Sequence, residues 1–272
     1  MEEVRSFLRK QAEGDLLPWK QHVFASNHFG LTLGQVEKLA LESDLLPSRY
    51  QRNRKTISVK EQLRLFQTHV AVIGCGGLGC YIIEEMTRLG IGHITAVDPD
   101  VFEEHNLNRQ LYATPAMLGQ PKVEAARKRV EEINPAVTLL PLKCAFSKVN
   151  GADILQNVTI VVDALDSIPV RLELSDVSSE MNIPMVHGAI GGWYGQIATQ
   201  FPGEDTLQKI YNRSANGTGV EKGLGNPSFT PAVIASLQVA EVCKIIIGQG
   251  TTLTRRKLHI NLLDMEFVEI QY

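Results

Sequence analysis

The 272-residue sequence contains little cysteine, few aromatic residues and no long run of one charge. Its four cysteines, Cys75, Cys80, Cys144 and Cys243, are scattered and form no C-x-x-C pair. We therefore expect no zinc site, and we interpret the cysteines as small buried residues in a reducing compartment. The net charge of −3 and the absence of lysine or arginine runs argue against a nucleic-acid surface.

The sequence also lacks the segments that mark export or membrane insertion. Its first twenty residues, MEEVRSFLRKQAEGDLLPWK, are charged and contain no signal-peptide core, and no apolar run approaches the length of a membrane span. We expect a cytoplasmic protein without a membrane partner. With 44% hydrophobic residues, the chain can bury the core of one large α/β domain, with or without a terminal extension.

The most informative stretch is a glycine-rich turn between a predicted strand and a predicted helix. Residues 70–73 are apolar, and residues 74–79, GCGGLG, separate them from a segment with helical spacing of apolar residues. A second apolar run, 94–97, ends in Asp98, about twenty residues past the turn, where a dinucleotide-binding βαβ unit places the acid that binds a ribose hydroxyl. The pattern predicts that the chain holds an adenosine nucleotide.

The glycines of this turn have separate predicted roles. Gly74 allows the tight turn, Gly76 lets the backbone approach a phosphate, and Gly79 lets the helix pack close to the strand. The alternative is a turn that merely packs a helix on a sheet. Arg109 and Lys122 follow in the next loop and favour the nucleotide, because cationic donors beside a phosphate turn stabilise charge on triphosphate oxygens.

Two carboxylates follow the strand predicted at 158–163. Ligands of doubly wound sheets bind outside the carboxyl ends of strands, which places Asp163 and Asp166 for Mg²⁺ or a polar substrate. The alternative is that Asp163 or Ser167 caps the next helix, so Asp166 is the predicted metal ligand. His187 ends a further strand, and we assign it no chemistry because a lone histidine there is more often structural.

The start of the chain is predicted to be helical and peripheral. Residues 1–48 contain two helical patterns, the second of which has Thr32 as its N-cap. Three arginines follow, Arg49, Arg52 and Arg54, which form either a solvated patch or a set of phosphate ligands.

The second half of the chain is predicted to be rich in strands. Residues 184–201 predict a strand, a glycine-rich bend and another strand, and 202–227 form a polar loop. A strongly apolar helix over 231–247 precedes a hairpin of strands at 257–263 and 265–272. The expected fold is α/β and Rossmann-like: a doubly wound, mostly parallel sheet with a C-terminal antiparallel extension and an N-terminal helical segment.

Together these segments resemble the MoeB/ThiF/HesA family, bacterial adenylyltransferases related to ubiquitin-activating enzymes. The resemblance rests on these motifs: RYQRN, VAVIGCGGLG, VDPDVFEEHNLNRQ, LGQPKVEAA, INP, VVDALDS, P-x-V-H-G-A-x-x-G-x-x-G-Q and SLQVAEVCKIIIG. We predict a helical extension over 1–48 and an adenylation domain over 49–272. Within that domain, the nucleotide-binding half covers about 65–182 and the carrier-tail half about 183–272.

The resemblance implies a role for each matching residue. The turn glycines are expected to line the ATP phosphates: Gly74, Gly76, Gly77 and Gly79. Four polar side chains are expected to hold the triphosphate: Asn106, Arg109, Gln110 and Lys122. Asp98 binds the ribose, Asp166 coordinates Mg²⁺, and Arg52 reaches the phosphates of the facing subunit, which implies a homodimer.

The implied reaction is adenylation. The carboxylate of a small ubiquitin-like sulfur carrier protein with a C-terminal Gly-Gly attacks the α-phosphate of ATP and releases pyrophosphate. A carboxylate needs no general base at neutral pH, but the charge of its electrophile must be shielded, which Arg52, Arg109, Lys122 and Mg²⁺ supply. The glycine-rich strand pair at 188–195 is expected to leave room for the carrier tail.

Departures from the family pattern and competing functions complete the prediction. The missing C-x-x-C pairs predict no zinc, and the absence of cysteine from 202–230 predicts a reaction without a thioester step. We also expect no C-terminal sulfurtransferase domain. The alternative substrate is a small-molecule carboxylate or a tRNA base. A nicotinamide-dependent oxidoreductase leaves Arg109, Lys122 and Asp166 unexplained, and the third class is a non-catalytic scaffold that docks a partner through 1–48.

Overall fold

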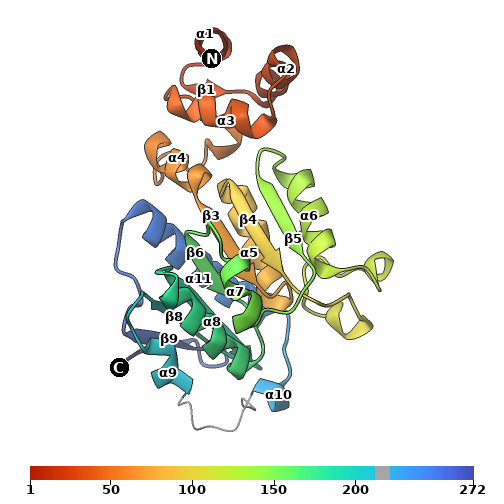
Figure 1. The fold of residues 1–272 in the computed structure, drawn as a ribbon, viewed down its shortest axis with the longest axis vertical. Coiled ribbons are helices and arrows are strands. Elements are labelled where there is room, and N and C mark those ends of the chain that lie inside the picture. The colour runs from red at the N-terminus through yellow and green to blue at the C-terminus, as the bar shows by residue number, and fades with distance from the viewer. Residues whose placement is uncertain (212–220) are drawn as a thin grey trace.

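The computed structural model describes residues 1–211 and 221–272, and its centre is an eight-stranded sheet (Figure 1). The strands lie across the sheet in this order: β10 (Glu266–Gln271), β9 (Arg256–Asn261), β8 (Tyr194–Gln200), β7 (Met185–Gly191), β6 (Ile160–Asp163), β3 (His69–Ile73), β4 (His93–Val97) and β5 (Thr138–Leu142). The five strands β5, β4, β3, β6 and β7 are parallel, and β8, β9 and β10 continue the sheet antiparallel. The predicted fold class is confirmed.

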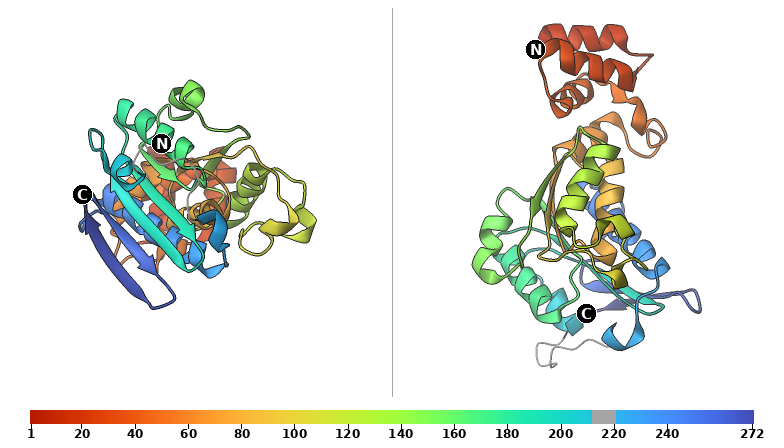
Figure 2. Two further views of the ribbon diagram at one scale, coloured as in Figure 1. Left: turned by 90° about the horizontal axis from the view of Figure 1, so that it is seen from below. Right: turned by 90° about the vertical axis from the view of Figure 1, so that its right-hand side faces the viewer.

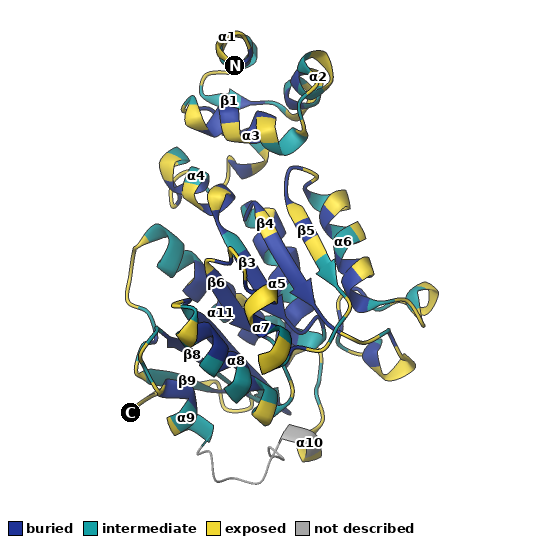
Figure 3. Ribbon diagram, viewed as in Figure 1, coloured by how far each residue is buried: buried dark blue, intermediate teal, exposed yellow. Residues whose placement is uncertain are grey.

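Helices cover both faces of the sheet, because side chains on the parallel strands alternate between two apolar layers. One layer contains α5 (Gly77–Leu89), α6 (Lys122–Ile133) and α11 (Phe229–Ile247), and the other contains α7 (Lys148–Ile154), α8 (Ile168–Glu180) and α9 (Thr206–Tyr211). On β3, Val70 and Val72 face the first layer, and Ala71 faces the second. Burial on both faces produces the continuous apolar strands seen in the sequence (Figure 3).

Helix α11 is, in the described part of the chain, the one helix long and apolar enough to cross a membrane by length and composition. The expectation that no apolar run approaches that length is wrong for this segment. The helix packs against β7 and β8, with Ile234 and Val239 in the core. Two of its buried polar side chains are hydrogen-bonded: Gln238 Nε2 donates to the Asp163 carbonyl, and Glu241 accepts a hydrogen bond from Thr199. In this fold it is a core helix.

The first 47 residues form a lobe with its own small core (Figure 2). It contains α1 (Glu2–Gln11), α2 (Trp19–Phe29) and α3 (Leu33–Glu42), and a short parallel pair, β1 (Leu16–Leu17) with β2 (Leu46–Pro47), closes it. Thr32 caps α3 in a capping box, as predicted, whereas α2 was not predicted. The low amphipathicity of α2 explains the omission, because periodicity was the signal used.

A buried junction joins this lobe to the amino ends of β4 and β5. Tyr50, in a single turn of 3₁₀-helix (Ser48–Tyr50), is fully buried, and its hydroxyl donates to Glu37 at 2.7 Å and accepts from Asn134 at 2.9 Å. Burial raises the pKa values of both Tyr50 and Glu37. Helix α4 (Val59–Gln67) then leads into β3. The lobe therefore lies at the end of the sheet where the parallel strands begin.

The polar segment predicted as a loop over 202–227 is partly helical. It contains α9 and a short helix, α10 (Glu221–Leu224), and residues 212–220 lie outside the described part of the chain. Helix α9 packs on β8 and α8, and Leu207 is fully buried in the second apolar layer. One buried leucine in a six-residue helix gives too little periodicity to predict from sequence.

Candidate active site

A cavity of about 560 Å³ opens where the parallel strands end. It is lined by the turn after β3 and by the loops after β4, β5 and β6. The cavity brings together these predicted site residues: Gly74, Gly76, Gly77, Asp98, Asn106, Arg109, Gln110, Lys122 and Asp166. Gly79 and Arg52 do not line it. Residues spread over more than ninety positions of the sequence thus meet at the carboxyl ends of the parallel strands, where α/β sheets bind ligands.

The glycine turn has the geometry of a phosphate cradle. Gly74 has φ +100°, and a Cβ there would lie 2.6 Å from the Ala164 carbonyl oxygen, so only glycine fits. A Cβ on Gly76 would have as its nearest neighbour the Gln110 side-chain nitrogen, 3.6 Å away, so this backbone is open to the cavity. Gly79 instead faces the Gly74 carbonyl, which gives it the predicted packing role but no place on the cavity wall.

Asp98 is buried at the end of β4 and is held by two backbone groups. Its Oδ2 accepts a hydrogen bond from the Cys75 N–H at 2.7 Å, and its Oδ1 accepts one from the Asp100 N–H at 2.8 Å. The first bond ties the predicted ribose ligand to the glycine turn. Since each carboxylate oxygen accepts more than one hydrogen bond, both oxygens keep capacity for ribose hydroxyls.

Lys122 supplies a buried cation at the start of α6. Its Nζ lies 2.8 Å from Asp100 Oδ2 and 3.9 Å from Asp98 Oδ1, and its side chain is 7% exposed. Asp100 was not among the predicted site residues, although it stands two positions after Asp98 in the same VDPD motif. Lys122 thus places a cationic side chain, paired with two carboxylates, at the cavity wall.

The loop after β4 places three more predicted residues. Asn106 and Gln110 are buried, and the Asn106 side-chain oxygen accepts a hydrogen bond from the Glu103 N–H. Gln110 Oε1 is buried without a hydrogen-bond partner among the described residues, beside the turn. Arg109 donates to the His105 carbonyl at 3.0 Å, and its Nε would lie 3.7 Å from a Cβ on Gly77. Its guanidinium therefore stands over the first turn of α5, whose N–H groups also attract anions.

Asp166 is exposed and lines the cavity in the loop after β6. Over residues 1–211 and 221–272, no group of three or more histidine, cysteine, aspartate or glutamate side chains is arranged to hold a metal ion. A single carboxylate still fits Mg²⁺, which proteins commonly bind through one or two carboxylates together with nucleotide phosphates. Asp166 is the cavity carboxylate best placed for that role, since Asp98 and Asp100 are paired with Lys122.

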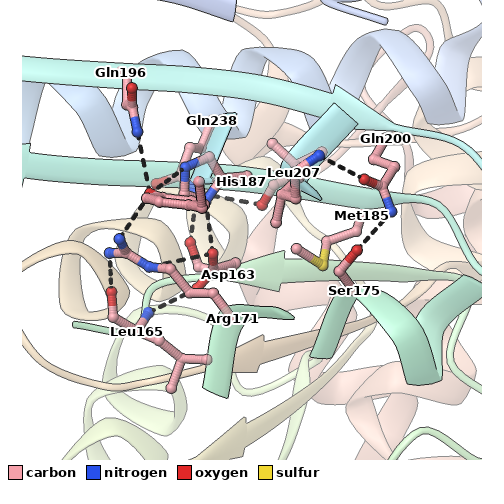
Figure 4. Close-up of polar contacts among 12 residues, drawn as sticks. Asp163, Leu165, Arg171, Ser175, Met185, His187, Gln196, Gln200, Leu207 and Gln238 are labelled. Carbon is pink, nitrogen blue, oxygen red and sulfur yellow. Dashed lines mark hydrogen bonds and ion pairs between the residues drawn. The ribbon is translucent and has the colours of Figure 1, made fainter. Parts of the chain in front are cut away.

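Asp163 has neither of the roles considered for it. It is fully buried below the cavity and caps no helix, and its Oδ2 lies 2.6 Å from His187 Nδ1 and 3.6 Å from Arg171 Nε (Figure 4). His187 is fully buried as well, which agrees with the interpretation that it is structural. No local pattern predicts this pairing, because the two residues are 24 positions apart.

Arg171 is a second cavity residue, after Asp100, that was not predicted from the sequence. It extends from α8, is 2% exposed, and donates to the Leu165 carbonyl and, at 2.8 Å, to the Tyr211 hydroxyl. An arginine side chain on a helix is normally exposed to solvent, so the sequence pattern did not suggest a buried site residue. The available signal was its position four residues after Ser167, which puts it on the turn of α8 that faces the end of β6.

The three arginines near residue 50 lie at the opposite end of the strands from the cavity. Arg49 hydrogen-bonds to Asn134 and stacks on Trp19, and Arg54 pairs with Asp15, so neither is a phosphate ligand in this chain. Arg52 is exposed and makes no ion pair or hydrogen bond within the described residues. Arg52 does not line the cavity of its own chain, so its predicted role requires a second copy of the chain.

Two glycines of the β7–β8 pair pack closely against α11. A Cβ on Gly188 would lie 2.7 Å from Gln238 Nε2, and one on Gly195 would overlap Ile234, both on α11. Gly192 has φ +58° and bonds to the Gly225 carbonyl at 2.7 Å. Gly188 and Gly195 therefore have a packing role against α11, and room for a carrier tail beside this strand pair stays a prediction.

The cysteines agree in part with their interpretation. Cys75 and Cys80 are fully buried; burial raises the pKa of the Cys80 thiol to about 12 and that of Cys75 well above its usual value. Both remain thiols at neutral pH. Cys144 and Cys243 are only half-buried, and Cys144 lies at the cavity wall.

A doubly wound sheet with a glycine turn and a cationic cavity at its carboxyl end defines a nucleotide-binding α/β protein. The model of the ThiF family matches residues 50–272. The chain belongs to this family.

Named relatives agree. The SAMP-activating enzyme E1 of Haloferax volcanii is 32% identical over 238 residues, which cover 86% of this chain and 88% of the relative. The molybdopterin-synthase adenylyltransferase of Escherichia coli is 31% identical over 216 residues, covering 77% and 85%. The predicted family and enzyme class, an adenylyltransferase, are confirmed. By contrast, the chain spans about half the length of the Xenopus laevis relative named adenylyltransferase and sulfurtransferase MOCS3 (48%).

Solved structures share the fold. Escherichia coli MccB crystallised with ATP superposes with a TM-score of 0.66 at 19% identity, and the match covers 82% of this chain and 71% of MccB.

Proposed function

We propose that this adenylyltransferase activates the C-terminal glycine carboxylate of a small ubiquitin-like sulfur carrier protein as an acyl-adenylate, with ATP as co-substrate and pyrophosphate as product. The observation that carries the proposal is the cavity, in which an open glycine turn faces Lys122 and Arg109. The names of the relatives support it, because they include a SAMP-activating enzyme and a sulfur carrier protein adenylyltransferase.

The residues divide the work by position. Asp98 receives the ribose hydroxyls, and the N–H groups of the turn at Gly76 and Gly77 receive phosphate oxygens. Lys122 and Arg109 neutralise negative charge on the triphosphate, which lowers the electrostatic repulsion between the α-phosphate and the incoming carboxylate. The carboxylate oxygen forms the bond to the α-phosphorus, and the bond to the β-phosphate bridging oxygen breaks. Pyrophosphate carries away the electron pair.

Mg²⁺ belongs to the proposal as the ion held by Asp166. When bound, it would supply positive charge to the departing pyrophosphate. Asp166 lines the same cavity as the glycine turn, so its carboxylate is available to an ion bound by the phosphates.

The proposal includes a homodimer. Arg52 is exposed and far from its own cavity, so it would complete a site only on a second subunit. We also propose that the reaction stops at the acyl-adenylate, because residues 202–230 contain no cysteine and burial keeps the thiols of Cys75 and Cys80 protonated. The proposed location is the cytoplasm.

ATP–pyrophosphate exchange tests the proposal. Exchange should require a carrier with an intact Gly-Gly tail and should fall at least a hundredfold in Arg109→Ala and Asp166→Ala, since each removes charge stabilisation worth about 3 kcal/mol. Arg127→Ala is the matched control, because Arg127 lies on the exposed face of α6 and pairs with Glu124 and Glu131.

The same assay separates the alternatives. Exchange driven by a small carboxylate or a tRNA, with no response to carriers, would replace the carrier by that substrate. ATP binding without exchange for any acceptor would contradict the proposed adenylation and favour a non-catalytic scaffold. Analytical ultracentrifugation of the wild type tests the dimer. Mixing Arg52→Ala chains with Asp166→Ala chains tests the role of Arg52: the mixed subunits should recover part of the exchange activity if Arg52 acts across the interface.

A further inference from the structure

Helix α9 packs on the second apolar layer through Leu207, and its last residue, Tyr211, adds a hydroxyl that bonds to three other side chains. Tyr211 Oη accepts hydrogen bonds from Arg171 Nη1 at 2.8 Å and from Gln196 Nε2 at 3.1 Å, and it lies 3.0 Å from His187 Nε2. The Tyr211 ring is edge-on to the His187 ring, with centroids 5.4 Å apart. The last residue of α9 therefore connects α8, β7 and β8.

The hydrogen bonds assign the protons of this network. Gln196 Oε1 accepts from Lys257 Nζ at 3.0 Å, which fixes the amide so that its nitrogen donates to Tyr211. A hydroxyl oxygen accepts two hydrogen bonds, and the two donors described above supply both. Tyr211 therefore donates its proton to His187 Nε2, and His187 Nδ1–H donates to Asp163 at 2.6 Å.

The network ends at the cavity. The Leu165 N–H donates to Asp163 Oδ1 at 2.9 Å, and the Leu165 carbonyl accepts from Arg171 Nη2 (Figure 4). Leu165 directly precedes Asp166, the exposed carboxylate of the cavity. Leu165 is thus held at both its N–H and its carbonyl, and Tyr211 binds the arginine that holds the carbonyl.

We propose that Tyr211 is a positioning residue for the metal end of the nucleotide site. With α9 docked, its hydroxyl orients Arg171, and Arg171 orients Asp166 through Leu165. The role of Asp166 toward Mg²⁺ in this inference rests on the proposed function. The consequence is that Mg²⁺·ATP binds best while α9 is docked, so α9 influences the site although none of its residues lines the cavity.

Binding calorimetry tests the relay without turnover. Tyr211→Phe keeps the ring against His187 and removes the hydroxyl. We expect a loss of about five- to tenfold in affinity for ATP with saturating Mg²⁺, and less than twofold with EDTA, because one hydrogen-bond step is lost on the path to Asp166. Tyr194→Phe is the matched control, because Tyr194 stacks on the His259 ring on the same sheet and has no part in the network.

A double-mutant cycle identifies the route. In an Asp166→Asn background, Tyr211→Phe should have no further effect on Mg²⁺·ATP affinity. Additive losses, or equal losses with and without Mg²⁺, would overturn the relay. If Asp166→Asn weakens binding and Tyr211→Phe does not, the relay fails alone; if Asp166→Asn has no effect, the metal role of Asp166 fails with it.

A second variant covers the case in which Tyr211→Phe does not fold. Arg171→Lys keeps the charge, but one ammonium cannot serve both Tyr211 and Leu165 as the guanidinium does. It should show the same Mg²⁺-selective loss, and an unchanged Mg²⁺·ATP affinity would overturn the proposal.

Discussion

Replacing Gly79 by alanine tests whether the turn geometry forms the nucleotide site. An added Cβ would lie 2.8 Å from the Gly74 carbonyl carbon and closer still to its oxygen. Both atoms are backbone, so neither can rotate away, and α5 must move away from the turn by roughly an ångström. Overpacking of this kind costs about 3 kcal/mol, a large part of the 5–15 kcal/mol by which domains are stable.

Urea unfolding followed by circular dichroism measures the loss of stability, and calorimetry measures ATP affinity. Gly77→Ala is the control, because its Cβ would meet nothing closer than Pro231 at 3.5 Å; its free energy of unfolding should stay within about 1 kcal/mol of the wild type. Gly76→Ala should keep stability but lose ATP affinity, since its Cβ would occupy the cavity side. A Gly79→Ala protein with wild-type stability and ATP affinity would refute the reasoning.

Two pH effects follow from buried groups in the lobe. His22 is buried, its Nε2 lies 2.8 Å from the Leu33 carbonyl, and burial lowers its pKa from 6.5 to about 4. Its contribution to stability is complete above pH 6.5 and is lost as the pH falls toward 4, about 2 kcal/mol by pH 5; urea titrations should show this slope, and it should disappear in His22→Gln. Burial raises the pKa of Glu37, which has the opposite sign: its contribution is present below pH 4.5 and is lost as the pH rises. Glu37→Gln should therefore gain stability relative to the wild type between pH 4.5 and 7.5, and parallel pH profiles would contradict this.

The parts of the site that were predictable are encoded by short spacings. The turn at 74–79 and Asp98 fall within one βαβ unit, whose residue types are dictated by local backbone geometry and by the phosphate. Lys122 was found because it begins a helix directly after a loop with turn residues. Such features need no knowledge of how distant strands pair.

The parts that were missed depend on strand order and helix packing. Arg171 and Tyr211 are 40 positions apart and meet only because β7 and β8 extend the sheet past β6. Gly188 and Gly195 look like open backbone in sequence, but α11 occupies the space beside them. Likewise, Arg49 belongs to the lobe junction, which no local pattern distinguishes from a solvated arginine.

The separation of the lobe from the cavity also gives the molecule two optical reporters. Trp19 lies beneath the Arg49 guanidinium, 4.6 Å from it, at the lobe junction. Trp193 lies in the β7–β8 turn, with its ring 4.5 Å from that of Phe229, three positions after the cavity residue Ile190. As these are the only tryptophans in the sequence, replacing either one leaves an intrinsic fluorophore that follows one end of the molecule alone. Loosening of the lobe and occupation of the nucleotide site can then be recorded as separate signals in the same unlabelled protein.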